Sequence, residues 1–200
     1  MSSTFNQLQA KRRSIYNLGK NVALPKTELT ALIKQTVRET PSSFNSQSSR
    51  VVILFGAEHE KLWNIVLETL RKIVAAEAFS ATEAKINNSF KAGFGTVLYF
   101  EDQAVVEDLQ QKFAAYADNF PIWSEQSGGM AQYAVWVALA EAGLGATLQH
   151  YNPIIDEEVA KTWNIPASWK LRAQMPFGSI EAAAGEKTYM DDESRFKIFG

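Results

Sequence analysis

The sequence predicts a layered α+β fold. Several stretches repeat apolar residues at helical spacing, whereas the short β-branched runs that fit buried strands are few and lie far apart along the chain. This order of elements does not follow the regular strand and helix alternation of a parallel sheet. A chain of 200 residues with 46% apolar content can bury one core of ordinary size, so we expect a single domain over residues 1–200.

The first half of the chain predicts two helices and two strands. Residues 26–40 carry apolar side chains at helical spacing between two prolines, which is typical of an amphipathic helix. The run VVILF at 51–55 is β-branched and is followed by Gly56, so it fits a buried strand. Residues 58–77 return to helical spacing and predict a long helix. TVLYF at 96–100 predicts the second strand.

Two further helices are expected after this strand. Residues 102–120 have helical period, with Asp102 as the N-cap. Residues 130–142 are apolar nearly all round, and Gly143 suits a helix C-cap. A helix without a polar face has to lie at the centre of the fold or in a subunit interface. The inward-facing residues expected for the first of these helices are Val105, Val106, Leu109, Phe113 and Tyr116.

The last elements are a strand, a short helix and a strand. ATLQHY at 146–151 predicts the first of these, residues 155–163 the helix, and WKLRAQMPFGSI at 169–180 the final strand. No internal repeat and no linker interrupts the chain, which agrees with one domain.

Composition excludes several classes of function. A formal net charge of -2 lacks the concentrated basic face that binds nucleic acid. No stretch approaches the roughly 18 to 20 apolar residues of a membrane span, and the N-terminus has no apolar signal segment, so we expect a soluble, cytoplasmic protein. Without cysteine, the chain has no disulfide, no thiolate nucleophile and no Cys-ligated zinc.

Common catalytic motifs are also missing. The chain has two histidines, His59 and His150, but no G-x-S-x-G motif that would supply a catalytic serine. No H-x-x-x-H pair predicts a metal site. His59 stands at a helix start and is expected to be a solvated surface residue. The acidic run at 191–193 is expected to be a solvated turn. Neither a dinucleotide fingerprint nor a P-loop occurs.

Two polar clusters near the N-terminus remain as candidate binding sites. Arg12, Arg13 and Ser14 offer two planar donor forks and a hydroxyl within one turn, which suits a phosphate monoester, although a solvated basic patch is the plainer alternative. The segment 42–47 could bind the edge of a polar planar ring, or it could simply be a loop of cap and turn residues. Its polar residues are Ser42, Ser43, Asn45, Ser46 and Gln47.

Two more candidates lie in the second half of the chain. In LQHYNP at 148–153 a strand ends in an amide, an imidazole and a phenol, which fits either a binding site or filling of the core edge. The C-terminal ESRFKIFG places Arg195 and Lys197 two residues apart on an extended segment.

Taken in order, five segments resemble the FMN-dependent nitroreductase family. They are KRRS, PSSFNSQSSRVVIL, the glycine-rich helix running into GLGATLQHYN, MPFGSI and the C-terminal SRFK, and together they cover essentially the whole chain. Within the family, KAGFGTVLYFED and the compact length resemble the subgroup named for a fatty-acid repression mutant protein. The resemblance implies a three-layer fold in which helices flank a central, mainly antiparallel sheet. It also implies a homodimer with one FMN in each of two sites built from both subunits.

The resemblance further implies which residues contact FMN. Arg12, Arg13 and Ser14 would hold the phosphate, the ribityl chain and the pyrimidine edge, and Arg195 and Lys197 would add charge at the phosphate. A first polar segment would reach the flavin of the partner subunit, and a second would lie against the isoalloxazine near N5. The residues are Ser42, Ser43, Asn45 and Gln47 in the first segment and Gln149, His150 and Tyr151 in the second.

The reaction implied by the resemblance has two half-reactions. NADH or NADPH would transfer hydride to flavin N5, and a nitroaromatic or quinone-like acceptor would then be reduced at the same face. No residue is assigned as a catalytic acid or base, and no metal is expected. Two departures from the family pattern bear on substrate choice, since QHY stands where many members have a glutamate-glycine pair and Tyr16 where they have lysine. A flavin-binding regulatory or stress-response protein with incidental reductase activity is the alternative, and a non-flavin interaction module is the third possibility.

Overall fold

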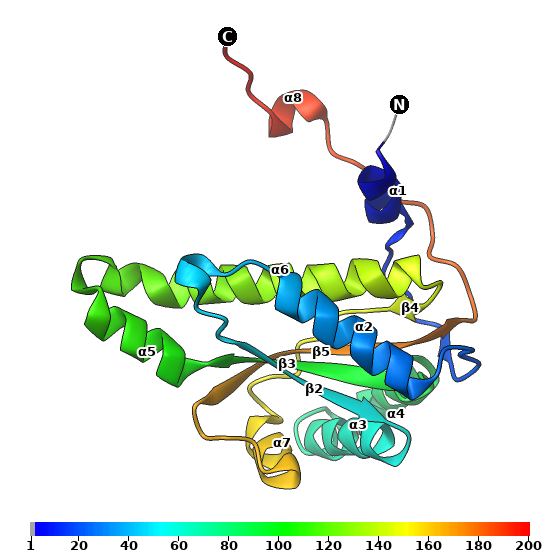
Figure 1. Cartoon of the computed structure of the whole chain (residues 1–200). Coiled ribbons are helices and arrows are strands. Elements are labelled where there is room, and N and C mark those ends of the chain that lie inside the picture. The colour runs from blue at the N-terminus through cyan, green and yellow to red at the C-terminus, as the bar shows by residue number, and fades with distance from the viewer. Residues whose placement is uncertain (1–2) are drawn as a thin grey trace.

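A five-stranded antiparallel sheet runs through the middle of the protein (Figure 1). The computed structural model describes residues 3–200. The strand order is β1-β5-β3-β2, with β4 also paired to β5. The strands are β1 (Leu18–Gly19), β2 (Ser49–Phe55), β3 (Gly95–Asp102), β4 (Gly145–Ala146) and β5 (Trp169–Ile180). This arrangement confirms the predicted α+β class and the central antiparallel sheet.

Helices cover both faces of this sheet (Figure 1). On one side α2 and α6 pack on the sheet through a core that includes Ile33 and Leu139, and on the other α3, α4 and α7 pack through a core that includes Trp63 and Val159. The three-layer arrangement is therefore confirmed. The helices are α1 (Thr4–Lys11), α2 (Lys26–Glu39), α3 (Ala57–Arg71), α4 (Ala76–Lys85), α5 (Gln103–Lys112), α6 (Phe120–Glu141), α7 (Asp156–Trp163) and α8 (Asp192–Arg195).

The middle strand β3 is buried along its whole length. Because side chains alternate between the faces of a strand, Leu98 and Phe100 enter one core, and Val97 and Tyr99 enter the other. The same double coverage buries the polar Glu101 near the end of the strand. Any polar side chain on β3 therefore needs a hydrogen-bond partner inside the protein.

Three predicted elements agree closely with the structure. The helix expected at 26–40 is α2, the short helix at 155–163 is α7, and the strand at 169–180 is β5. Asp102 caps α5 as predicted, since its carboxylate accepts from Ala104 N at 3.2 Å. Gly143 follows α6 with φ +80°, the left-handed conformation that a glycine adopts readily after a helix.

The prediction of a single helix over residues 58–77 is wrong. The chain leaves α3 after Arg71 and re-enters a helix at α4, because Ile73 N and Val74 N both donate to Leu70 O and close a turn. Ile73 is consequently 62% exposed instead of continuing the apolar stripe. The turn lets Phe79 of α4 pack back on the same core.

The helix predicted at 102–120 is also interrupted. α5 ends at Lys112, and a 3-10 turn (Ala114–Asn119) leads directly into α6. Phe113 and Tyr116 do not face inward as expected but are 40% and 48% exposed. Both rings instead contact Phe44, at centroid distances of 5.0 Å and 6.0 Å.

The strand predicted at 146–151 is much shorter than expected. Only Gly145–Ala146 forms β4, and Gln149 returns to the sheet through an isolated bridge with Gln174. α6 begins at Phe120, earlier than the predicted 130–142. Within residues 3–200 no helix combines the length and apolar content needed to cross a bilayer.

Candidate functional site

The first part of the candidate site is a pocket at the end of α1. Ile15 N donates to Ala146 O at 3.0 Å and Ser14 forms a parallel bridge with Ala146, so the chain after α1 is fixed against β4. A cavity of about 490 Å³ lies between residues 12–17 and 182–187. The predicted Arg12, Arg13 and Ser14 all line it.

Arg12 is held in this pocket by α6. Its guanidinium carbon lies 4.4 Å from the centroid of the Trp136 ring, and Trp136 Nε1 donates to Ala146 O at 3.1 Å. The Nε of Arg12 is buried and has no hydrogen-bond partner among residues 3–200. A buried N–H of a charged group without an acceptor is costly, so this donor suits an anion such as a phosphate oxygen.

The predicted phosphate ligands Arg195 and Lys197 do not line the cavity beside Arg12. Arg13 Nη2 donates to Gly185 O at 2.6 Å, which ties the start of the C-terminal arm (residues 182–200) to the pocket. The arm then leaves the body, and α8 with Arg195 lies apart from it (Figure 1). Arg195 and Lys197 are both exposed. Their role at a phosphate stays a prediction.

The second part of the site is the polar loop (residues 42–49), which connects α2 to β2 and includes Ser49, the first residue of β2. Phe44, Asn45 and Gln47 have φ of 57°, 51° and 49°, a left-handed conformation that costs free energy for residues other than glycine. Gln47 N donates to Ser42 Oγ at 2.9 Å, and this bond closes the loop on itself. A neighbouring cavity of about 290 Å³ is lined by Ser42, Gln47, Ser49, Lys34, Arg38 and Arg50, among others.

The two parts of the site meet α6 at different points. Ser43 N donates to Ser127 Oγ at 3.4 Å, whereas Arg12 stacks on Trp136. Ser127 and Trp136 lie roughly 13 Å apart along the helix axis, at 1.5 Å per residue. The polar loop and the arginine pocket therefore contact α6 at separate points, and the cavities beside them have no lining residue in common.

The third predicted segment, residues 149–151, is fixed by Gln174 of β5. Gln149 and Gln174 exchange backbone hydrogen bonds, and Tyr151 N donates to Gln174 Oε1 at 2.7 Å. The Tyr151 ring packs edge-on against Trp63 at 5.9 Å, and burial raises the pKa of its phenol, with a further contribution from Tyr16. His150 is exposed.

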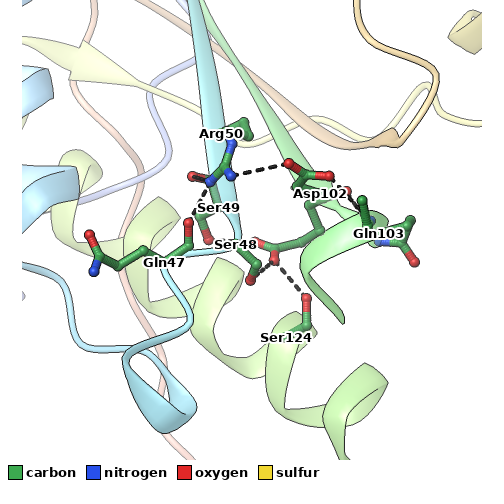
Figure 2. Close-up of polar contacts among 9 residues, drawn as sticks. Gln47, Ser48, Ser49, Arg50, Asp102, Gln103 and Ser124 are labelled. Carbon is green, nitrogen blue, oxygen red and sulfur yellow. Dashed lines mark hydrogen bonds and ion pairs between the residues drawn. The ribbon is translucent and has the colours of Figure 1, made fainter. Parts of the chain in front are cut away.

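A buried carboxylate beneath the polar loop was not anticipated from the sequence. Glu101 is 1% exposed, and its Oε2 accepts from Ser48 Oγ and from Ser124 Oγ, both at 2.6 Å. Ser49 Oγ donates to Oε1. Figure 2 shows Ser48 from the loop and Ser124 from α6 converging on this shared acceptor. The one available signal was its position directly after the apolar run 96–100.

His59 is buried, and its prediction as a solvated residue is wrong. It is 0% exposed, with Nδ1 2.8 Å from Thr96 Oγ1 and Nε2 3.2 Å from Lys91 O. Trp63 Nε1 donates to the same Thr96 hydroxyl at 3.0 Å. Burial lowers the pKa of His59 to about 4, so the ring is neutral. Its spacing to Leu62 and Val66 on the buried stripe of α3 could have revealed this position.

The described residues offer no site for a metal. Within residues 3–200, no group of three or more histidine or acidic side chains is placed to hold an ion. The candidate site comprises the arginine pocket, the polar loop with its neighbouring cavity, and residues 149–151.

Comparison with known proteins identifies relatives along most of the chain. The model of the nitroreductase family matches residues 10–179. The nitroreductase FRM2 of Saccharomyces cerevisiae is 35% identical over 198 residues, which cover 96% of this chain and 97% of that protein.

Solved structures agree with this match. Nitroreductase CinD from Lactococcus lactis, in complex with chloramphenicol, has a TM-score of 0.90 and 54% identity, covering 98% of this chain and 100% of that chain. A nitroreductase with bound FMN from Desulfitobacterium hafniense shares the fold, with a TM-score of 0.74 and 14% identity over the full length of both chains. On these matches, the chain belongs to the nitroreductase family and is an oxidoreductase.

Proposed function

We propose that the protein is an FMN-dependent oxidoreductase that uses NADH or NADPH to reduce nitroaromatic or quinone-like acceptors. The observation that carries the proposal is the buried Nε of Arg12, which has no partner among residues 3–200 and lies in a cavity of about 490 Å³ lined also by Arg13 and Ser14. Two planar donor forks and a hydroxyl match the chemistry of a phosphate monoester. The related CinD structures contain chloramphenicol and 4-nitrophenol, which supports a nitroaromatic acceptor.

In this proposal the protein binds and orients, and the flavin supplies the redox chemistry by accepting hydride and passing electrons on. Arg12, Arg13 and Ser14 hold the phosphate end. Gln149 and His150 stand on the segment that Gln174 fixes, and we assign this segment to the isoalloxazine. Tyr151 packs its ring against Trp63 and donates its backbone N–H to Gln174 Oε1, so it helps to fix this segment.

We further propose that the active form is a homodimer whose two sites are shared. Three features support this. The polar loop and the arginine pocket meet α6 at points roughly 13 Å apart. The apolar side of α6 lines a hollow of about 530 Å³ with α2, and Met130 there is 43% exposed. The C-terminal arm extends away from the body and carries exposed Ile198 and Phe199 (Figure 1).

In the dimer, the polar loop of one subunit would face the flavin held by the arginine pocket of its partner. Ser42, Ser43, Asn45 and Gln47 would supply donors and acceptors to the ring edge.

Within the family, we assign the protein to the subgroup named for a fatty-acid repression mutant protein, on the basis of the stretch KAGFGTVLYFED.

One spectroscopic experiment tests the proposal. The purified protein, incubated with FMN and passed through a desalting column, should retain a flavin absorption band. Anaerobic addition of NADH or NADPH should bleach the band, and 4-nitrophenol or a quinone should restore it. A protein that stays colourless after incubation, or a bound flavin that neither nicotinamide reduces, would contradict it.

A further inference from the structure

We infer that Glu101 is a positioning residue whose buried carboxylate holds the polar loop in the conformation presented to the flavin. The inference rests on the proposed function, since it assigns a role toward the ligand of that site. It adds to the site a residue that none of the sequence motifs had singled out. Glu101 itself would not touch the flavin; it acts through Ser48 and Ser49.

The first support is the pattern of hydrogen bonds. Ser49 lies directly opposite Glu101 in the β2–β3 register, and Ser48 precedes it at the end of the loop. A carboxylate only accepts, and each serine hydroxyl has one proton to donate, so all three serines point their protons at Glu101. Ser48 and Ser49 thereby fix the loop to the central strand, whereas Ser124 only joins the same carboxylate to α6.

The second support is the conformation of the loop that these bonds hold. Phe44, Asn45 and Gln47 all have positive φ, and such conformations persist only where the surroundings fix them. Next to the carboxylate, Arg50 donates to Gln47 O and pairs with Asp102 at 3.1 Å (Figure 2). The loop is thus fixed at its β2 end by two adjacent acidic residues of β3.

The third support is the cost of the arrangement. No salt bridge reaches Glu101 within residues 3–200, because Arg50 pairs with its neighbour Asp102. A buried carboxylate balanced only by hydroxyls adds little stability over an apolar residue of similar size. What it does provide is a fixed direction for two loop serines. The carboxylate at this position is therefore better explained by the direction in which it holds the two serines than by a contribution to the stability of the fold.

The helix α6 is shaped to accept this carboxylate. A Cβ at Gly128 would lie 2.7 Å from Glu101 Oε1, so any other residue there would require the carboxylate to move. Next to it, Gly129 has nothing within 4 Å of such a Cβ. The close approach therefore concerns Glu101 and not the packing of α6 in general.

Two serines provide a matched test. Ser48 and Ser124 donate to the same oxygen at the same distance, but only Ser48 belongs to the loop. Ser48→Ala should raise the FMN dissociation constant about tenfold, the scale of one lost bond to a charged group, while Ser124→Ala should change it less than about twofold. Ser49→Ala serves as a second loop-side variant if Ser48→Ala does not fold.

Hydrogen exchange of the protein without flavin adds a readout that does not depend on binding. Ser48→Ala and Glu101→Gln should speed amide exchange over residues 42–49, and Ser124→Ala should not. Equal effects of the two serine variants on FMN affinity and on loop exchange, in a parent protein that binds FMN, would overturn the inference. A parent that binds no FMN would instead overturn the proposed function, and with it the role of the loop toward a flavin.

Discussion

The guanidinium of Arg12 lies over the indole of Trp136, with its central carbon 4.4 Å from the ring centroid, and its buried Nε has no acceptor in the described part of the chain, residues 3–200. The stack orders the arginine before any ligand arrives, so little side-chain entropy remains to be lost on binding. The same indole donates to Ala146 O, which links the position of the arginine to the end of β4.

Arg12→Ala should weaken FMN binding by about 1.5 to 3 kcal/mol, the range for hydrogen bonds to a charged group. Riboflavin, which lacks the phosphate, should bind the variant and the parent nearly equally. Titration of flavin fluorescence measures both affinities. Arg71→Ala is a suitable control, because Arg71 pairs with Glu83 in the opposite layer of helices. Equal affinity of the unmodified protein for FMN and riboflavin would show that the arginine pocket does not bind the phosphate.

Ala134→Glu or Ala138→Glu should disrupt the dimer and release FMN with it. Both alanines line the apolar hollow between α2 and α6, where a buried carboxylate without a partner is costly. Assembly and flavin binding should fall together if the sites are shared. Light scattering and the flavin to protein ratio measure the two. Ala76→Glu, at the exposed start of α4, should change neither. A monodisperse monomer that keeps stoichiometric FMN would rule out the shared site.

Acid should destabilise the protein through His59. Its pKa is about 4 in the folded protein and 6.5 by reference, so the unfolded chain binds the proton first. Stability is fully present above pH 6.5 and falls as the pH drops toward 4, by about 3 kcal/mol in total from this group. Urea unfolding at several pH values measures the slope.

His59→Gln should flatten this pH dependence, although it lowers stability at neutral pH by disturbing the bonds to Thr96 and Lys91. An unaltered slope in His59→Gln would mean that other groups cause the acid sensitivity.

Gly128→Ala and Gly129→Ala should have opposite effects on stability. Alanine favours a helix over glycine by up to about 1 kcal/mol, so Gly129→Ala should stabilise α6, where the new methyl group meets nothing. At Gly128 the methyl group would displace a carboxylate that three serines hold, so this variant should be destabilised and should bind FMN more weakly. Thermal unfolding and FMN titration of the pair decide the matter. Similar behaviour of the two variants would contradict the close packing around Glu101.

Local patterns in the sequence determined much of the fold. Helix α2 lies between two prolines and repeats apolar residues on one side. Strand β5 occupies the same residues, 169–180, that the sequence predicts as a strand. Arg12, Arg13 and Ser14 were identifiable because they are close in the chain, and the structure keeps them around one cavity. Such features depend on neighbours in sequence, which local periodicity and composition describe.

Tertiary structure alone decided which polar side chains are buried and what they bond. His59 and Glu101 are ordinary surface residues by type, yet the sheet is covered on both faces and each finds its partners on segments distant in sequence. The exposed Phe113 and Tyr116 show the converse, since the turn after α5 directs their rings to Phe44 instead of the core. Helical spacing can place a residue such as His59 on a buried face, but a one-dimensional pattern does not tell which distant segment covers it and supplies its hydrogen-bond partner.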